Sequence, residues 1–270
     1  MKLSIIICTY NAGECLGNAL NSLLTQTYKD FEVVIMDSAS VDETLDIIKD
    51  YENKFDGGLR WVSEKDDGIY DAMNKGVDLA TGDWVYFLGA DDILFDDGVL
   101  DKISENMTKE NDVLYGNVEW GGGGKIYDGK FSALKIMEEN ICHQAIFFRK
   151  QVFEKIGKFE VKYKAWADWA FNLKWFCNED IKNKYVNLVI ARYNTDGFSS
   201  EGDDMTFVRE FDFLIEKHFP REYLDNRNKI KNLEQQICNK DQEINSIKSL
   251  KFWKIREKYL KLRSFLNNRI

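Results

Sequence analysis

Several features that would indicate other classes of protein are missing from this chain of 270 residues. It has one proline and five scattered cysteines, none of them in a C-x-x-C pair. Neither a zinc knuckle nor a disulfide framework is therefore indicated, and we expect reduced, mostly buried thiols in a cytoplasmic protein. No apolar run approaches the roughly 20 residues that span a bilayer, and Leu3 to Cys8 is too short for a secretory signal. Any membrane contact must be peripheral.

Charge is distributed unevenly along the chain. The formal net charge is −9, which argues against a protein that binds nucleic acid. Residues 248–270 nevertheless contain eight Lys or Arg and a single Glu, a local charge of +7, which leaves −16 for the rest. An acidic body with a basic tail predicts two functions in one chain.

Strand and helix signals alternate in the first half of the chain. Short apolar runs are typical of strands buried on both faces, and the segments between them have helical spacing. The predicted strands are residues 3–8, 31–36, 59–63 and 84–88, and the predicted helices are 17–24, 42–51 and 69–80. In the second half we predict strands at 113–120, 141–149 and 185–193 and helices at 166–177 and 205–218. Repeated βα units predict an α/β fold, with a mostly parallel sheet flanked by helices and ligands bound beyond the carboxyl ends of the strands.

The pattern changes near residue 225, so we expect a catalytic domain over 1–222 and a helical tail over 223–270. Apolar residues on a 3-4 spacing run for about three heptads, with Lys240 interrupting them: Ile230, Leu233, Ile237, Ile244 and Ile247. This predicts either a coiled coil that joins copies of the chain through residues 226–250, or an amphipathic helix folded back on the domain.

Aromatic and basic residues interleave in the last part of the tail. Trp253, Tyr259 and Phe265 stand among lysines and arginines within residues 248–270. A basic amphipathic helix of this kind can lie on an anionic surface, here the inner face of the cell membrane. A solvated helix and a dimer contact are the alternatives.

Three loops at the predicted ligand-binding edge carry the chemistry. The first, Cys8-Thr9-Tyr10-Asn11, lacks the G-x-G-x-x-G of a dinucleotide fold, which disfavours a Rossmann oxidoreductase. It offers a hydroxyl, an aromatic face and an amide that could grip a base and ribose. The stretch from Thr9 to Glu14 contains no basic residue, which argues against a sugar-1-phosphate nucleotidyltransferase.

The second loop begins at Asp37, whose carboxylate can accept a hydrogen bond from a pyrimidine N–H. Ser38 and Ser40 follow it and could serve the base or the ribose. By themselves these residues could equally be helix caps, which favour Ser, Thr and Asp.

The third loop, Gly89-Ala90-Asp91-Asp92, follows an apolar strand. Adjacent carboxylates are costly to hold without a counter-charge, and oxygen ligands at a strand end suit Mg²⁺ or Mn²⁺. A metal there could neutralise a departing nucleoside diphosphate. For an isolated acidic pair, the alternative is a turn followed by a helix cap.

Taken together, the three loops resemble the family 2 inverting glycosyltransferases with the GT-A fold. The resemblance covers roughly residues 3 to 200 and rests on five motifs in the same order as in the family. The matching stretches are Ser4–Asn11, Phe31–Ser40, Asp67–Gly76, Ala80–Asp83 and Phe87–Asp92. It implies an inverting transfer from a nucleotide sugar to a glycan or lipid-linked acceptor, often for a bacterial surface polysaccharide.

The resemblance also implies roles for individual residues. Thr9, Asn11 and Asp37 would hold the nucleoside, for which a pyrimidine makes UDP the first choice. Asp91 matches the last acid of the family's D-x-D motif and would bind the metal. Gly89 replaces the first acid of that motif, a loss for which Asp92 could compensate. In the Asp67–Gly76 stretch, Asn74 could contact the donor phosphates, although a polar helix face is the alternative.

The catalytic base of the family is an acid at the start of a helix in the second half. Here the matching stretch is Lys164–Trp169, in which Ala167 replaces the usual Glu and Asp168 remains. Inverting transfer needs a base within hydrogen-bond reach of the acceptor hydroxyl, a task that Asp168 would perform. Trp166 and Trp169 could stack on sugar rings and limit the access of water. Without the upstream motifs, Asp168 would be a helix N-terminal acid.

Cys142-His143-Gln144 resembles a His-Gln strand that precedes the base in the family. His143 and Gln144 are therefore candidates for contacts with the acceptor, the diphosphate or the metal, and a hydrogen-bonded structural role is the alternative. A different class of function also stays open. Because Gly89 and Ala167 each remove an expected acid, the chain could be a sugar-nucleotide-binding or assembly protein built on the same fold.

Overall fold

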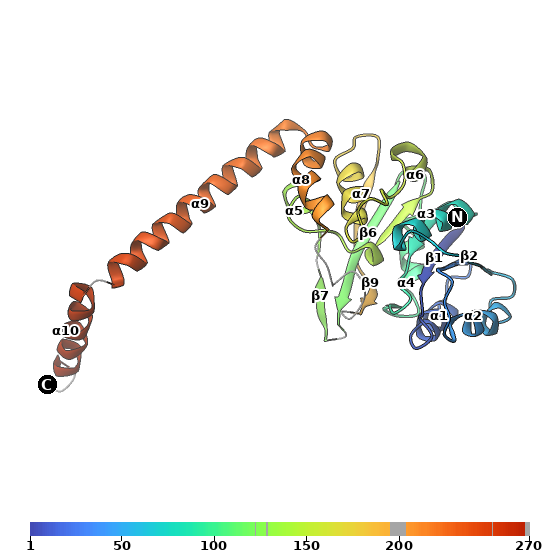
Figure 1. The fold of residues 1–270 in the computed structure, drawn as a ribbon, viewed down its shortest axis with the longest axis horizontal. Helices are drawn as coiled ribbons and strands as arrows, with labels where there is room; N and C mark the ends of the chain where they lie inside the picture. The colour runs from blue at the N-terminus through green and yellow to red at the C-terminus, as the bar shows by residue number, and fades with distance from the viewer. Residues whose placement is uncertain (122, 128, 195–203, 250, 268–270) are drawn as a thin grey trace. The chain divides into compact units, whose positions relative to one another are not determined.

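A computed structural model of the protein describes residues 1–121, 123–127, 129–194, 204–249 and 251–267. The chain forms two compact units, Met1–Pro220 and Arg221–Ile270. The second unit contains the helices α9 (Arg221–Ser249) and α10 (Lys251–Asn267), and the first contains the other elements (Figure 1). None of the helices in these ranges is long and apolar enough to cross a membrane.

The first unit is built on one sheet with the strand order β3-β2-β1-β4-β8-β6-β9-β5, to which β7 is added as a partner of β6. The strands are β1 (Leu3–Thr9), β2 (Phe31–Asp37), β3 (Leu59–Ser63), β4 (Trp84–Phe87), β5 (Ile93–Leu94), β6 (Val113–Trp120), β7 (Lys125–Tyr127), β8 (Ile146–Arg149) and β9 (Asn183–Tyr193).

The pairing of the strands brings most of their carboxyl ends to one edge of the sheet. β1 is parallel to β2 and β4, and β2 is parallel to β3. β8 is antiparallel to both β4 and β6, so β6 runs in the same direction as β4, and β9 is parallel to β6. The edge that receives the ends of β1 to β4 therefore also receives the ends of β6 and β9. The predicted α/β sheet is confirmed. The short strands β5 and β7 were not predicted, and β8, which lies within the predicted strand 141–149, runs antiparallel to its neighbours.

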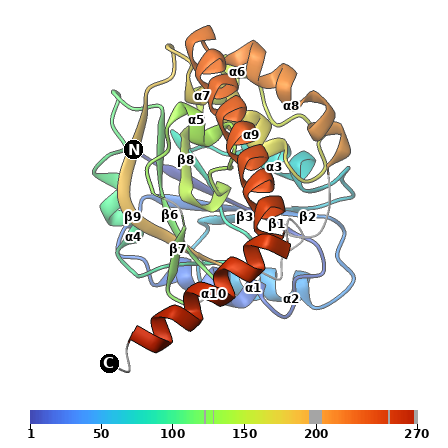
Figure 2. The ribbon, with the colours of Figure 1, turned by 90° about the vertical axis from the view of Figure 1, so that its left-hand side faces the viewer.

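Helices cover both faces of this sheet (Figures 1 and 2). They are α1 (Leu16–Leu24), α2 (Thr44–Glu52), α3 (Ile69–Leu79), α4 (Val99–Ser104), α5 (Ala133–Ile136), α6 (Gln151–Ile156), α7 (Ala167–Phe176) and α8 (Met205–His218). On one face, Leu20 of α1 and Leu100 of α4 belong to the same buried cluster as Ile5 of β1. On the other face, α3 lies so close to β1 that a Cβ added to Gly76 would come within 2.5 Å of the Ile6 side chain.

Aromatic rings fill the second face and fix the position of α7. Phe153 of α6 stacks on Phe171 of α7 with ring centroids 5.1 Å apart, and both rings meet Phe148 of β8 edge to face. Phe87 of β4 and Phe159 complete the group. Buried aromatic pairs of this geometry add stabilisation beyond their area. They hold the first turn of α7, which carries Asp168, against the sheet.

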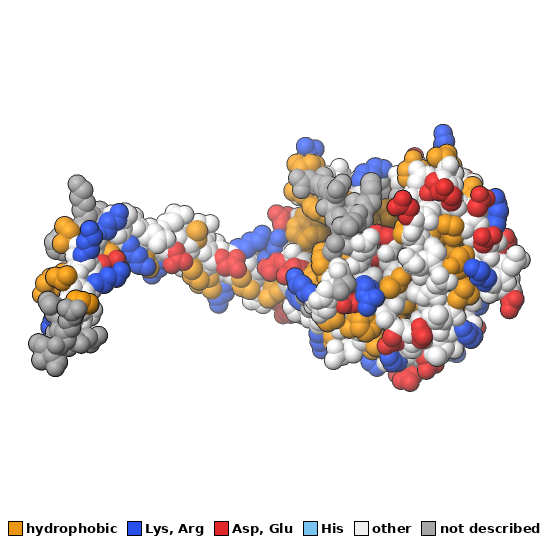
Figure 3. Space-filling view, turned by 90° about the horizontal axis from the view of Figure 1, so that it is seen from below, with side chains coloured by type: hydrophobic (Ala, Val, Ile, Leu, Met, Phe, Trp, Pro, Cys, Tyr) orange, Lys and Arg blue, Asp and Glu red, His pale blue; other side chains and the backbone are white. Residues whose placement is uncertain are grey.

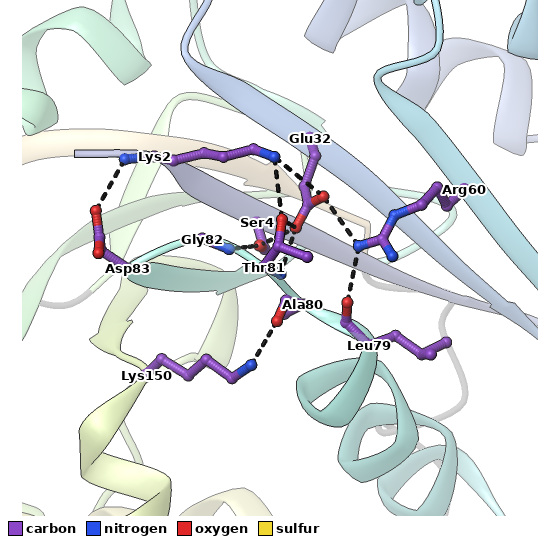
Figure 4. A network of polar contacts seen from close by, with 10 residues as sticks. All are labelled: Lys2, Ser4, Glu32, Arg60, Leu79, Ala80, Thr81, Gly82, Asp83 and Lys150. Carbon is purple, nitrogen blue, oxygen red and sulfur yellow. Dashed lines mark hydrogen bonds and ion pairs between the residues drawn. The ribbon is translucent and has the colours of Figure 1, made fainter.

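At the opposite edge, a buried carboxylate ties the beginnings of the strands together (Figure 4). Glu32 is 5% exposed and accepts hydrogen bonds from Ser4 Oγ at 2.6 Å and from both the backbone N–H and the hydroxyl of Thr81. Arg60 donates to it at 2.9 Å. Burial raises the pKa of Glu32, but these hydrogen bonds and the charge of Arg60 outweigh burial and lower the pKa to about 2. Glu32 thus joins β1, β2, β3 and the turn before β4.

The prediction of one strand over residues 141–149 is wrong in its first half. A short 3-10 helix, η1 (His143–Ala145), precedes β8, and the Ala145 N–H donates to the carbonyl of Cys142 at 2.9 Å. In this turn the Gln144 side chain is buried and donates a hydrogen bond to Asp92.

Candidate active site

The predicted nucleotide-binding loops follow β1 and β2 and are organised from inside by Asp37. Its carboxylate, 2% exposed, accepts hydrogen bonds from Thr9 Oγ1 at 2.9 Å, from Ser63 Oγ at 2.6 Å and from the backbone N–H of Ser40 at 3.0 Å. The Ser40 hydroxyl also donates to it. A pyrimidine N–H would have to replace one of these donors, so base recognition by Asp37 stays a prediction.

The two loops are also bonded to each other. The backbone N–H of Asn11 donates to Ser40 Oγ at 2.8 Å, and the Val41 N–H donates to Asn11 Oδ1 at 3.0 Å. Asn11 and Ala39 both have positive φ angles, of 49° and 52°. This conformation is uncommon outside glycine and is tolerated best by Asn and Asp. Beside these clasped loops Tyr10 is 69% exposed, which leaves an aromatic face available to a base.

After β4, the acid pair Asp91-Asp92 combines one accessible carboxylate with one buried carboxylate. Asp92 is 1% exposed and accepts from Gln144 Nε2 at 2.6 Å and from the backbone N–H of Asn194 at 2.8 Å. The Asn194 side chain donates to Asp91 Oδ2 at 3.3 Å. Burial and the neighbouring charge of Asp91 raise the pKa of Asp92 to about 6, although the Asn194 and Gln144 hydrogen bonds oppose them.

The Asp92 carboxylate occupies the space beside Gly89. A Cβ at position 89 would lie 2.2 Å from Asp92 Oδ2, closer than real Cβ contacts allow, and 3.1 Å from Asp91 Oδ1, which is a tight contact. An acid at position 89 and the observed Asp92 conformation therefore exclude each other. The loop keeps a carboxylate at this place, supplied from three residues further along the chain.

This pair fits a divalent cation in its chemistry. Mg²⁺ and Mn²⁺ take carboxylate oxygens, and Mg²⁺ in particular is commonly held by one or two carboxylates together with substrate phosphates and water. The pKa of Asp92 is raised first by burial and then by the charge of Asp91, and a cation bound beside the pair would favour the ionised carboxylate. Within the described parts of the chain, no group of three or more His, Cys, Asp and Glu forms a metal site. A cation at Asp91 and Asp92 would therefore need further ligands from the donor.

Asp168, the predicted base, lies in the first turn of α7 with both carboxylate oxygens in hydrogen bonds. Its Oδ1 accepts from the Trp169 N–H at 2.8 Å and lies 3.0 Å from the Tyr70 hydroxyl, and its Oδ2 accepts from Asn140 Nδ2 at 2.9 Å. Burial and the charge of Asp168 hold the pKa of Tyr70 well above its usual range, so the hydroxyl stays protonated. The Tyr70 hydroxyl also lies 2.7 Å from the Ala165 carbonyl, to which it can donate instead. A carboxylate has about four lone-pair sites, so one on Oδ2 stays available.

A chain of amides fixes Asn140 in turn. Asn172 Nδ2 donates to Asn140 Oδ1 at 2.9 Å, and Trp175 Nε1 donates to Asn172 Oδ1 at 2.9 Å. Because Asn140 Oδ1 is occupied as an acceptor, its NH₂ group must point to Asp168. The packed core of α7 thereby sets the orientation of the carboxylate.

The segment Cys142–Gln144 connects the two carboxylate sites. His143 Nδ1 lies 3.6 Å from Asp168 Oδ2, while the neighbouring Gln144 donates to Asp92. Cys142 donates from its thiol to Gln144 Oε1 at 2.7 Å, since burial and the charges of Asp92 and Asp168 raise the pKa of that thiol far above its usual range. The acid pair and the predicted base thus lie at the two sides of one short turn.

Comparisons with known proteins agree with this arrangement. The model of the family described as Glycosyl transferase family 2 matches residues 4–167. A relative from Mycobacterium bovis, named a PGL/p-HBAD biosynthesis glycosyltransferase, is 40% identical over 210 residues, which cover 76% of this chain and 82% of the relative. The chain belongs to glycosyltransferase family 2.

Solved structures share the GT-A-like fold of this family 2 glycosyltransferase. Residues 1–349 of S. aureus TarS, in complex with UDP-GlcNAc, match with a TM-score of 0.62 at 24% identity, over 76% of this chain and 61% of that one. The mannosyltransferase PcManGT from Pyrobaculum calidifontis, in complex with GDP-Man and Mn²⁺, matches with a TM-score of 0.60 at 14% identity, over 94% of this chain and 82% of that one.

Three further predicted residues of this glycosyltransferase make contacts within the protein. Asn74 donates to the Phe159 carbonyl at 2.9 Å and accepts from the Phe159 N–H at 3.0 Å. Trp169 Nε1 donates to the Ile136 carbonyl at 2.8 Å, and the rings of Trp166 and Trp169 pack against Phe207 of α8. These contacts anchor loops and helices, and the roles of the three residues toward ligands stay predictions.

Three residues of the site were not identified from the sequence. Tyr70 lies within the Asp67–Gly76 stretch but was not among the predicted site residues, and Asn140 and Asn194 carry no local motif. All three touch a predicted acid only because distant segments meet, over 98, 28 and 102 residues of chain respectively. Their amide and hydroxyl groups could have marked these three residues as candidates in the sequence, but the sequence could not show which acid each of them binds.

Proposed function

We propose that this glycosyltransferase moves a sugar from a UDP-activated donor to a hydroxyl of a glycan or lipid-linked acceptor, with inversion at the anomeric carbon, in the synthesis of a cell-surface polysaccharide or glycolipid. One observation carries the proposal. The turn Cys142–Gln144 joins Asp92 on one side to Asp168 on the other, so a leaving-group site and a base lie next to each other. Single displacement requires this pair of functions on opposite sides of the reacting carbon.

The choice of UDP rests on the loops after β1 and β2 and on relatives. Tyr10 offers an exposed ring, and Asn11 and Ser40 hold the loops in the clasped form. TarS, which shares the fold, was solved with UDP-GlcNAc. A GDP-sugar is the competitor, since PcManGT was solved with GDP-Man.

The proposed mechanism begins at Asp168 Oδ2, the oxygen with a lone pair left over. It takes the proton of the acceptor hydroxyl, and the acceptor oxygen forms a bond to the anomeric carbon. The bond from that carbon to the donor phosphate breaks, and its electron pair leaves with the nucleoside diphosphate. Tyr70 and Asn140 keep the carboxylate in place by donating to it.

Asp91 and Asp92 are the residues that would hold Mg²⁺ or Mn²⁺. When bound, the cation supplies positive charge to the departing diphosphate. Gln144 and the backbone of Asn194 fix Asp92, and Asn194 fixes Asp91 through its side chain. The protein thus orients both oxygen ligands before the donor arrives.

A sugar-nucleotide-binding protein without activity is the competing function, because Gly89 and Ala167 replace acids. The position of Asp92 beside Gly89 weakens the first argument. The argument from Ala167 is weaker too, because this residue is fully buried in α7, whereas the neighbouring Asp168 supplies a carboxylate that hydrogen bonds hold in place.

The tail has its own proposed role. Described side chains of α10 include Ile255, Tyr259 and Phe265, each more than half exposed, among lysines and arginines (Figure 3). We propose that α10 binds the anionic inner face of the membrane, near a lipid-linked acceptor. Residues 250 and 268–270 of the predicted tail lie outside the described residues. None of the described side chains of α9 is buried, and its exposed stripe of Leu233, Ile237, Ile244 and Ile247 supports self-association through residues 226–250.

A thermal-shift screen tests the donor site. UDP, GDP, dTDP and CDP are each added with Mn²⁺ or with a chelator, because a ligand of the native state raises the melting temperature. A shift with UDP that depends on the metal supports the proposal. No shift with any nucleotide would contradict it.

A further inference from the structure

An aromatic surface lies at the ligand-binding edge, outside the residues discussed so far. Trp120 ends β6 and pairs in register with Tyr193, which ends β9. Their ring centroids are 5.0 Å apart, and the ring of Tyr127 on β7 lies 5.5 Å from Trp120. Because β6 and β9 run in the direction of β1 and β4, this aromatic group lies at the edge that carries the loops of the candidate active site.

In this aromatic group Tyr193 is buried, whereas the ring of Trp120 is exposed. Tyr193 is buried in a small apolar cluster that also contains Ala145 and packs against Tyr127 and Cys142. Trp120 is 39% exposed, and it is the one exposed tryptophan among the seven in the chain, all of which lie in the described parts. A half-exposed indole that packs on two tyrosine rings at a strand end offers a flat aromatic face to a ligand.

The two tyrosines that contact Trp120 are each linked to a residue that binds one of the site carboxylates. Tyr193 is followed by Asn194, whose N–H donates to Asp92 at 2.8 Å. The Tyr127 hydroxyl donates to the carbonyl of Asn140 at 3.1 Å, and the Asn140 side chain donates to Asp168. Trp120 is therefore fixed relative to both the leaving-group site and the base.

We infer that Trp120 is a binding platform for a sugar ring of the acceptor. The flat face of an indole matches the apolar C–H face of a pyranose, and its negative quadrupole attracts the C–H groups. A sugar ring held there would lie beside residues whose neighbours bind Asp92 and Asp168. This inference rests on the proposed glycosyl transfer. It differs from the predicted stacking on Trp166 and Trp169, whose rings pack against α8.

Binding of methyl glycosides to the full-length protein tests the platform without catalysis. Saturation-transfer NMR is recorded with methyl glycosides of glucose, galactose, rhamnose and N-acetylglucosamine, in the presence of UDP and the diamagnetic cation Mg²⁺. These probes contain no aromatic group of their own. For the glycoside that binds best, Trp120→Ala is expected to weaken binding about tenfold, and Trp120→Phe to retain most of it. Ile126→Ala, an exposed neighbour on β7, is the matched control and should bind as the original protein does.

UDP binding to each variant separates this inference from the proposed function. If the original protein binds no nucleotide, the proposed function fails. If UDP binds equally to all variants and Trp120→Ala binds the glycosides as well as the original protein does, only the platform is overturned. The platform is also overturned if no glycoside gives a signal with the UDP-bound original protein.

Discussion

The carboxylate of Asp92 occupies the space that any side chain at Gly89 would need: a Cβ there would lie 2.2 Å from Asp92 Oδ2. The first acid of the family's D-x-D motif is absent from the sequence, but a carboxylate stands beside its position. Two hydrogen bonds keep Asp92 there, from Gln144 and from Asn194. Residues 89 and 92 are therefore coupled: a side chain at position 89 should change the position of the Asp92 carboxylate.

Gly89→Ala should uncouple Asp92 from its hydrogen bonds. The added methyl group forces the carboxylate away and leaves the buried Gln144 amide unsatisfied, at a cost of about 1–3 kcal/mol in the free energy of unfolding. We expect a loss of that size in urea unfolding, together with weaker metal-dependent nucleotide binding. Gly123→Ala is the control, since a Cβ there meets nothing within 4 Å. Equal stability of the two variants would show that Asp92 moves aside freely.

The metal-dependent part of UDP binding should weaken in mild acid. The pKa of Asp92 is raised to about 6, so its carboxyl is ionised above that pH and protonated below it. Because a metal ion binds the ionised form, the extra thermal shift that Mn²⁺ gives to UDP should be large at pH 7.5 and small at pH 5. Asp92→Asn should give a small shift at both. If the extra thermal shift from Mn²⁺ in the original protein were the same at both pH values, Asp92 would not be a ligand of the metal.

Glu32 should make the stability of the fold depend on acid. Its pKa in the folded state is lowered to about 2 from 4.5, so its contribution is complete above about pH 5 and is lost as the pH falls through 2. On the order of 2 kcal/mol should separate the original protein from Glu32→Gln at pH 7 in urea unfolding, and less at pH 3. The exposed Glu105→Gln is the control. If the difference in the free energy of unfolding between the original protein and Glu32→Gln were the same at pH 3 as at pH 7, packing of the side chain rather than its ionisation would account for the difference.

The strands at the centre of the sheet could be predicted because each carries a clear local pattern in its sequence. β1, β2 and β4 are apolar runs buried on both faces, and the loops after them carry the recognisable motifs. The second half could not be predicted so well. Residues 141–145 have the composition of a strand, but residues 143–145 form η1, where the buried Gln144 side chain donates to Asp92. The competing contact lies 52 residues away and leaves no local signal.

The same limit applies to the candidate site. Sequence motifs indicated Asp91, Asp92 and Asp168, but not that Asp37 is enclosed by four donors. Burial of a polar group is decided by the neighbours that satisfy it, here Thr9, Ser40 and Ser63. Nor could the sequence show that Trp120, at the end of β6, is the exposed tryptophan.

The tail should bind anionic membranes through α10. Full-length protein should sediment with vesicles that contain phosphatidylserine at low salt, and much less at high salt or with phosphatidylcholine alone. The triple variant Lys254→Gln, Lys258→Gln, Lys261→Gln should lose this binding. The same change of charge in α9, made at Lys229, Lys231 and Lys240, should retain it. If the original protein does not sediment, self-association through residues 226–250 becomes the role of the tail, and sedimentation velocity would then show a dimer or larger species.

The most direct test of the account is the transfer activity of Asp168→Asn. The substitution keeps the size of the side chain but removes the base. With a donor that the original protein transfers, the rate should fall by about 10²–10⁴, while the affinity for UDP with Mn²⁺ stays the same. The exposed Asp180→Asn should be as active as the original protein. Transfer by Asp168→Asn at the normal rate would contradict the central claim that Asp168 takes the acceptor proton.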